Sequence, residues 1–390
     1  MSAAACRTLP GVSRDVAEIR ADFPALSRHT YLNAAAASPT PRPVRAAVET
    51  LHRQLEEDGD LHWEAWNTRK EEVRASVARL INAEADEIAF VPNTSTGINL
   101  IADLLERDGP VTSDTLEFPT VTLPWRHRGL PIRFVEPRQD GSLDPRDFAA
   151  VVDNEGGRSA TGPGPRGTLL ISHVQFSNGC RQDLDAFAEV TDGRHFVVCG
   201  SQSAGAFPID VRRNRIDAFA TAGHKWLCAG YGAGFCYVSR ALLERPPRTM
   251  GWMSVRRPFA FDNREYELLP SNRRTELGCP PFAQIFSLGA AVEYLLGIGI
   301  DWISQRILAL NTYLTDELAR VGVTVLSPGG PHRSGETLCA FDRPSEVVEF
   351  LTSRDVHVTK KPEGIRVATH FYNDEQDVDR LVAALRAYRA

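Results

Sequence analysis

The chain has 390 residues, of which 43% are hydrophobic and 24% are charged, and its formal net charge is −6 at pH 7. This is the composition of a globular protein long enough for a large domain and a smaller one. Its charges form no long run of one sign, so nucleic acids and membrane surfaces are not expected as partners. The sequence shows no apolar run long enough to span a bilayer and no signal peptide, so we expect a cytoplasmic location.

Cysteine usage points to the same compartment. The seven cysteines are odd in number, scattered along the chain and without a CxxC pair. Such cysteines are typical of reduced thiols rather than of a disulfide framework or a structural zinc site. We expect no bound metal.

Helices and strands alternate through the first two thirds of the chain. Residues 12–30 predict an amphipathic helix and a turn, and residues 42–82 predict two helices. The expected strands lie at 87–91, 114–118, 131–136, 167–173, 195–199, 217–221 and 233–238. Further helices are expected at 98–105, 145–152, 183–191 and 240–245. Alternation with short links predicts an α/β domain with a largely parallel sheet.

The pattern changes beyond Pro246 and Pro247. Long helices are expected at 280–298 and 301–321, short strands at 323–326, 336–341, 356–359 and 364–368, and a final helix at 374–388. These elements predict a second, smaller α+β domain. We therefore divide the chain into an N-terminal arm and helix (1–30), a large α/β domain (31–245) and a small C-terminal domain (246–390), with a Gly- and Pro-rich surface loop at 154–167.

Lys225 is the first candidate for chemistry. It follows the small-residue turn at Ala222-Gly223 and precedes a stretch with three glycines in five positions, 230–234. A lysine in a pocket can have a lowered pKa and form an imine with a carbonyl. The alternative is a lysine at a strand end that reaches solvent through its stem.

A second candidate site is the turn Asn93-Thr94-Ser95-Thr96-Gly97, between a strand and a helix. Three hydroxyls and free backbone N–H groups at a helix N-terminus suit a phosphate. An N-cap cluster is the alternative, although three consecutive hydroxyls exceed what a cap requires. The turn has neither the dinucleotide-binding nor the Walker spacing.

A third candidate is the end of the strand at 195–199, where Cys199 is followed by a small polar turn containing Gln202. Ligands of open α/β sheets bind at the carboxyl ends of parallel strands. These motifs occur in the order found in fold-type I, pyridoxal-phosphate enzymes of the class V aminotransferase/cysteine desulfurase superfamily. The chain resembles that family from about residue 31 to its C-terminus.

The resemblance implies a large, mostly parallel seven-stranded sheet, pyridoxal 5′-phosphate as cofactor, a small-molecule amino-acid substrate, and a homodimer with shared active sites. It implies that Lys225 is the Schiff-base lysine and that Arg366 holds the substrate carboxylate, for which a guanidinium fork is well suited. A lone arginine on a strand would otherwise more often form a surface ion pair. Asn33 is a further substrate contact. The cofactor-binding residues implied by the family pattern are Thr94, Ser95, Thr96, Phe118 on the ring, Gln175 and Gln202 at the 3′-oxygen, Cys199, His224 and Cys279.

Several positions depart from the family pattern. Cys199 stands where members usually have an aspartate that pairs with the pyridine nitrogen, and a thiol holds no fixed negative charge. Either the cofactor is then a weaker electron sink, which handicaps transamination more than β-elimination, or the chemistry is unchanged. Cys279 replaces a threonine that reaches the neighbouring subunit's phosphate, and Ala222 replaces a phosphate-binding serine.

The segment before Arg366 also lacks the nucleophilic cysteine of desulfurases, so persulfide formation is not expected. We therefore expect a lyase that deprotonates Cα and eliminates from Cβ, a C–S lyase on a cysteine conjugate, with a natural-product pathway as one setting. The alternatives are an aminotransferase, a decarboxylating or oxidatively deaminating enzyme, and a non-catalytic pyridoxal-phosphate-binding scaffold.

Overall fold

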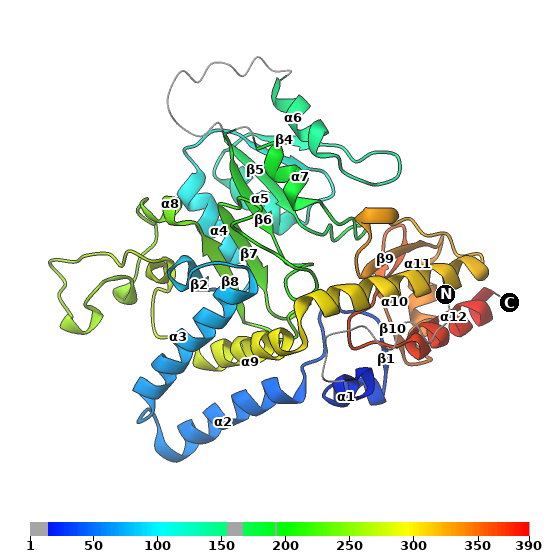
Figure 1. The fold of residues 1–390 in the computed structure, drawn as a ribbon, viewed down its shortest axis with the longest axis horizontal. Coiled ribbons are helices and arrows are strands. Elements are labelled where there is room, and N and C mark those ends of the chain that lie inside the picture. Colours follow the sequence, from blue (N-terminus) through cyan, green and yellow to red (C-terminus); the bar gives the residue numbers. More distant parts are fainter. Residues whose placement is uncertain (1–14, 154–166, 192, 390) are drawn as a thin grey trace.

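A seven-stranded sheet forms the centre of the larger part of the molecule (Figure 1). The computed structural model describes residues 15–153, 167–191 and 193–389. The strands are β2 (Ile88–Phe90), β3 (Val111–Asp114), β4 (Ile132–Val135), β5 (Thr168–Ser172), β6 (His195–Cys199), β7 (Ala218–Ala222) and β8 (Gly234–Val238). Their order is β2-β8-β7-β6-β5-β3-β4. Strands β4, β3, β5, β6 and β7 are parallel, whereas β8 and β2 are antiparallel to their neighbours, which confirms a largely parallel sheet.

Both faces of this sheet are buried. Along β6, Phe196 and Val198 belong to one hydrophobic cluster, and Val197 and Cys199 belong to another. Continuous apolar strands of this kind are typical of a sheet covered by helices on both faces. Helices α2 (Arg42–Asp58) and α3 (Trp63–Leu80) precede these strands, and α8 (Arg240–Leu243) follows them. The helices between the strands are α4 (Thr94–Leu105), α5 (Pro119–His127), α6 (Pro145–Asp153) and α7 (Leu184–Glu189).

The smaller part is built on an antiparallel sheet in the order β11-β12-β9. Its strands are β9 (Glu336–Ala340), β11 (Thr359–Lys361) and β12 (Gly364–Ala368), and its helices are α10 (Ile300–Arg320), α11 (Pro344–Thr352) and α12 (Glu375–Arg389). Strand alternation places Cys339, Ile365 and Val367 in the core beneath α12. The opposite face therefore carries the polar residues Glu336 and Arg366.

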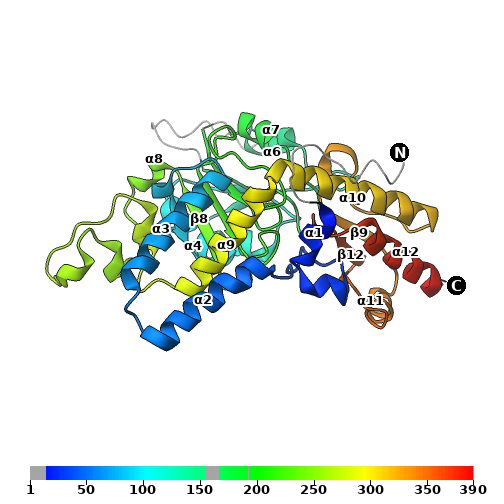
Figure 2. The same cartoon turned by 60° about the horizontal axis from the view of Figure 1, so that its bottom comes forward.

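Both ends of the chain contribute to this smaller part. After α1 (Val16–Ala21), strand β1 (Thr30–Tyr31) pairs in parallel with β10 (Val356–His357). Conversely, α9 (Phe282–Ile298) packs on α2 and α3 (Figure 2). A Cβ on Gly289 of α9 would lie 2.2 Å from Val73 of α3, so this close approach requires glycine. The domain division at residue 245 stays a prediction.

The expected strand at 114–118 is wrong in its bounds. Strand β3 ends at Asp114, whose carboxylate accepts a hydrogen bond from the backbone N–H of Leu116 and turns the chain toward α5. At 323–326 the structure forms only an isolated bridge between Val325 and Cys339. Of the loop expected at 154–167, residues 154–166 lie outside the described residues.

No single helix in the described ranges is long and apolar enough to cross a membrane. Helices α9 and α10 pass that test of length and composition only as a pair, and the chain bends by 78° between them.

Candidate active site

Lys225 lines a cavity of about 220 Å³ at the carboxyl ends of the central strands. Strand β7 ends at Ala222, and the turn at Gly223 is tight, because a Cβ there would lie 2.9 Å from both the Ala229 Cβ and the Ala233 carbonyl oxygen. Burial lowers the pKa of the Lys225 ammonium, although the nearby Glu336 and Cys199 oppose this shift. The amine is thus prepared to act as a nucleophile and a base.

The N-terminus of α4 forms one wall of this cavity. Asn93 is the N-cap, and its side chain accepts a hydrogen bond from the Thr96 backbone N–H. Thr94 and Ser95 line the cavity, with their hydroxyls 2.7 Å from Ser201 and 2.8 Å from Thr120, respectively.

The Thr96 hydroxyl instead lies 3.2 Å from the Asn93 amide oxygen. Of the three hydroxyl residues predicted to bind phosphate, Thr94 and Ser95 therefore line the cavity, whereas Thr96 belongs to the helix cap. The Thr96 backbone N–H is taken by the Asn93 cap, so the preceding N–H groups of the first turn are those left for an anion.

Two rings border the cavity near Lys225. Phe118 is 48% exposed, and the Lys225 Nζ lies 6.0 Å from its ring centroid. His224 stacks on Tyr231, with ring centroids 4.7 Å apart. Burial, helped by the adjacent Lys225 charge, lowers the pKa of His224 to about 4, so its imidazole is neutral at pH 7.

Gln202 and Cys199 also line the cavity. The Gln202 amide accepts from the Trp226 indole N–H at 2.7 Å and donates to the Ala35 carbonyl at 3.0 Å, which holds its orientation. The Cys199 Sγ lies 3.3 Å from the Ser201 hydroxyl. Burial raises the pKa of the Cys199 thiol, and the carboxylate of Glu117 raises it further.

Gln175 occupies a different environment from the one predicted. It is fully buried, is not among the described residues lining the cavity, and donates to Asp114 at 3.0 Å and to Glu117 at 3.1 Å. The reason is strand direction: beyond β5 the backbone of Gln175 pairs with Cys180, and the neighbouring residues Val174 and Phe176 face the cavity instead.

The predicted carboxylate site lies on the polar face of the small sheet. The Arg366 Nη1 is 3.2 Å from the carbonyl oxygen of Phe176, a residue that lines the cavity. Asn33 forms an isolated bridge with Ala368 and accepts a hydrogen bond from the Thr359 hydroxyl. The structure thus brings Arg366 to the rim of the Lys225 cavity from the other part of the chain.

Two charged residues at this rim were not predicted. Glu336 lies 3.2 Å from Arg366, and Lys361 donates to the Phe176 carbonyl at 2.8 Å. Burial lowers the pKa of Lys361 to about 8 and raises that of Glu336. The only sequence signal was for Glu336, which lies on the strand whose alternate residue Cys339 belongs to the core.

Cys279 is exposed and is not among the described residues that line the Lys225 cavity. Within this chain it therefore makes no contribution to the site. Its predicted contact with the phosphate of a neighbouring subunit stays a prediction.

Comparisons with known proteins agree with this geometry. Residues 30–381 match the family model described as Aminotransferase class-V. A probable cysteine desulfurase from Methanothermobacter thermautotrophicus is 32% identical over 313 residues, which are 77% of this chain and 74% of that protein. The uncharacterized aminotransferase YcbU of Bacillus subtilis is 27% identical over 94% of this chain and 96% of its own length.

Among solved structures, a complex of the cystine C–S lyase C-DES with cysteine persulfide superposes with a TM-score of 0.83 at 23% identity, over 93% of this chain and 99% of that chain. This similarity supports the fold-type I architecture. The chain therefore belongs to the aminotransferase class-V family of enzymes, whose cofactor is pyridoxal 5′-phosphate.

Proposed function

We propose that the protein is a pyridoxal-phosphate-dependent lyase that cleaves the C–S bond of a cysteine conjugate by β-elimination. One observation carries this proposal: among the described cysteines, Cys199 alone lines the cavity of Lys225. Cys339, on the small sheet near Arg366, points into the core, and burial raises the pKa of its thiol to about 12. Apart from Cys199, whose thiol is hydrogen-bonded to Ser201, no described thiol is therefore placed to receive sulfur from a substrate held at Arg366.

The residues present fit the cofactor. Thr94, Ser95 and the N-terminus of α4 suit its phosphate, Phe118 suits the face of its ring, and Lys225 suits its aldehyde. When bound, the cofactor supplies a sink for the electron pair left at Cα. Gln202, held by Trp226 and Ala35, keeps one amide N–H for the ring oxygen.

The substrate is held by the small sheet. The Arg366 guanidinium binds the α-carboxylate, and Asn33 forms a bridge with Ala368, two residues further along the same strand. The Lys225 Nζ then takes the proton from Cα, a role for which its lowered pKa is suited. The thiolate leaves from Cβ, and hydrolysis of the released enamine gives pyruvate and ammonia.

An aminotransferase is the second candidate, because the relative from Bacillus subtilis is named as one. Decarboxylation or oxidative deamination and a non-catalytic scaffold stay as further alternatives. In an aminotransferase, the proton taken from Cα would be returned to the cofactor and the Cβ substituent would stay on the product. In a lyase, the Cβ substituent would leave. The products therefore separate the two candidates.

The experiment offers the purified holoenzyme an S-substituted cysteine, and separately an amino acid with no Cβ leaving group plus a keto acid. We expect pyruvate and ammonia from the first, and little keto-acid amination from the second. Lys225→Ala should lose turnover by at least about 10²–10⁴-fold together with the visible absorbance of the attached cofactor. Lys360→Ala is the matched control, because Lys360 is exposed and its ammonium hydrogen-bonds to the exposed surface residue Ser345 rather than to a residue of the cavity. Amination without any pyruvate would contradict the lyase proposal.

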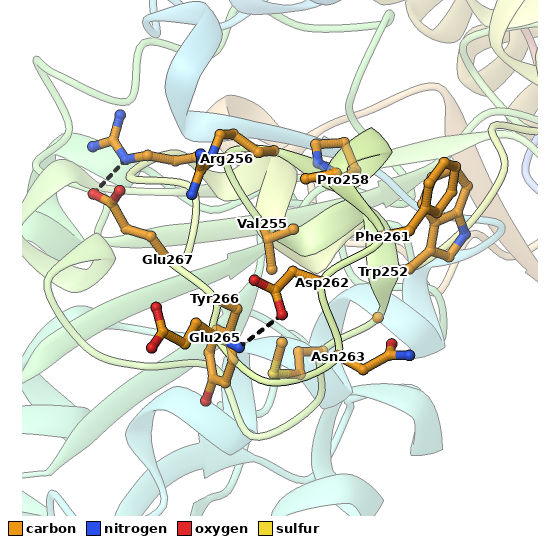
Figure 3. Close-up of a pocket in the computed structure, with 14 residues that line it drawn as sticks. Trp252, Val255, Arg256, Pro258, Phe261, Asp262, Asn263, Glu265, Tyr266 and Glu267 are labelled. Atoms are coloured by element: carbon orange, nitrogen blue, oxygen red, sulfur yellow. Dashed lines mark hydrogen bonds and ion pairs between the residues drawn. The ribbon is translucent and has the colours of Figure 1, made fainter.

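We also propose a homodimer with shared active sites, located in the cytoplasm, where the free described cysteines would remain reduced. The support is the segment 250–267, which projects from the body of the molecule (Figure 1) and surrounds a hollow of about 660 Å³ (Figure 3). Its rings of Trp252, Phe259 and Phe261 form an exposed aromatic cluster, with Phe261 73% exposed. Sedimentation of the protein and of Phe261→Glu would test this proposal, the variant being expected to dissociate.

A further inference from the structure

A short parallel strand pair joins the two ends of the chain, and three potential metal ligands lie on its outer face. Strand β1 pairs with β10 over only two residues of each strand (Figure 1). Val356 belongs to the hydrophobic core of the smaller part, so strand alternation turns its neighbours Asp355 and His357 to the outer face. On β1, Thr30 is buried in the same way, and the preceding residue His29 therefore lies on the outer face as well.

The side chains of these three residues converge. One ligand atom from each of His29, Asp355 and His357 lies within 4.8 Å of the other two. The His29 Nδ1 is 3.2 Å from the Asp355 Oδ1, and the His29 and His357 rings meet edge to face with their centroids 5.1 Å apart. The His357 Nε2 is buried and has no hydrogen-bond partner among the described residues. A buried nitrogen without a partner is costly, so a ligand that reached it would stabilise the site.

We propose that His29, Asp355 and His357 form a binding site for a divalent transition-metal ion, with Zn²⁺ as the ion that suits the ligands best. Two imidazole nitrogens and one carboxylate oxygen are typical ligands of Zn²⁺, whereas Mg²⁺ and Ca²⁺ prefer oxygen ligands alone. The site lies apart from the Lys225 cavity, whose described lining residues include none of the three. It is therefore independent of the proposed lyase chemistry.

The geometry of the cluster is close to that of a tetrahedral zinc site. Around a zinc ion with bonds of about 2.0–2.1 Å, neighbouring ligand atoms lie about 3.4 Å apart. His29 and Asp355 already have this spacing, and small side-chain rotations would bring His357 to the same distance. The side chains of His29 and Asp355 are 41% and 69% exposed, so an ion can enter from solvent and water can fill its fourth position.

A bound ion would fasten the N-terminal segment to the smaller part. His29 precedes β1, whereas Asp355 lies 326 positions later in the chain, next to β10. Beneath the cluster, the Thr30 backbone N–H donates to the Asp355 carbonyl, and the Leu32 backbone N–H donates to the His357 carbonyl. A metal bridge between the two strands would restrain both of these hydrogen bonds, in a strand pair that is otherwise short.

The proposal goes against the expectation of no bound metal, which rested on the spacing of the cysteines. Chain order hides this cluster, because strand pairing alone brings its ligands together. A second histidine–aspartate contact, between His62 and Asp58 at 2.9 Å, gathers no third ligand among the described residues. His62 therefore offers a matched control, an ion pair of the same chemistry without a metal site.

Equilibrium dialysis of the untagged holoprotein against Zn²⁺ tests the site without turnover. We expect the wild type to bind one zinc ion that the variants His29→Ala, His357→Phe and Asp355→Asn bind at least about 10–100-fold more weakly. His357→Phe keeps a ring against His29, and asparagine tolerates the left-handed backbone of Asp355, whose φ is 56°. His62→Ala should bind zinc as the wild type does.

Hydrogen exchange supplies a second readout, which does not depend on counting metal ions. Zn²⁺ should slow exchange of the Thr30 and Leu32 N–H groups in the wild type and in His62→Ala, and should have no such effect in the three ligand variants. Absence of zinc binding by the wild type would overturn the proposal. Equal binding by the wild type and all three ligand variants would do the same, because the zinc would then be held elsewhere, such as at the exposed Cys279.

Discussion

The Glu336 Oε2 lies 3.2 Å from the Arg366 Nη1, and both side chains are almost fully buried. Arg366 pairs with Leu338 and Ala368 pairs with Glu336 across β12 and β9, so the two charged residues are diagonal neighbours on one face of the small sheet. A substrate carboxylate at Arg366 would therefore meet an existing anion. We therefore predict that Glu336 sets the affinity for a substrate held at Arg366.

Glu336→Gln should lower KM for an α-amino acid by about three- to tenfold, because it removes a charge that opposes the substrate carboxylate. The amide keeps an acceptor for Arg366, so kcat should change little. Burial raises the pKa of Glu336, and the wild-type KM should fall as Glu336 is protonated at lower pH. Steady-state kinetics against pH would show this trend in the wild type and not in the variant; a higher KM in Glu336→Gln would contradict it.

Lys361 should add a second loss of affinity with rising pH. Burial and the Arg366 charge lower the pKa of Lys361 to about 8, so its positive charge is lost as pH rises through that value. Affinity for an anionic substrate should therefore weaken above pH 8. In Lys361→Arg the charge persists and the weakening should disappear. Equilibrium titration with a carboxylate inhibitor would measure both profiles, and identical profiles would exclude Lys361 from the site.

Cys199→Asp should destabilise the cofactor-free protein despite restoring the residue usual in the family. The new carboxylate would lie near Glu117, which already neighbours Asp114, and we expect a loss of about 2–4 kcal/mol in unfolding free energy. Glu117→Gln in the same protein should recover at least half of this loss. Urea unfolding of the two single variants and the double variant gives the coupling free energy between residues 199 and 117. If the two single effects simply add, the new carboxylate does not interact with Glu117 and the prediction is contradicted.

Gly97→Ala should weaken both stability and cofactor binding. A Cβ on Gly97 would lie 2.8 Å from the Ala220 Cβ, so the first turn of α4 would have to move away from β7. We expect a cost of about 1–3 kcal/mol and a weaker hold on phosphate. Gly297→Ala in α9 is the control, since a Cβ there meets nothing within 4 Å and should be neutral or stabilising. Thermal unfolding and inorganic phosphate titration would compare the two; equal effects would contradict this account.

Local sequence was sufficient to predict those features that depend on residues close together in the chain. The apolar run at 195–199 predicted β6 with its observed bounds, and the small-residue turn at Gly223 predicted the position of Lys225. The hydroxyls after Asn93 predicted the N-terminus of α4 as an anion site, because capping and helix dipoles act within a few residues.

Only the tertiary structure shows which side chains meet when distant segments of the chain pair. The sequence alone was sufficient to predict the class V fold, and it assigned Lys225 as the cofactor's lysine, which stays a prediction. It also placed Gln175 at the cofactor, whereas the fold turns Gln175 to Asp114 and Glu117. Glu336 lies 30 residues before Arg366 and becomes its neighbour only through strand register. Hydrogen bonds and charges act over a few ångströms of space, and strand pairing rather than chain order sets those distances.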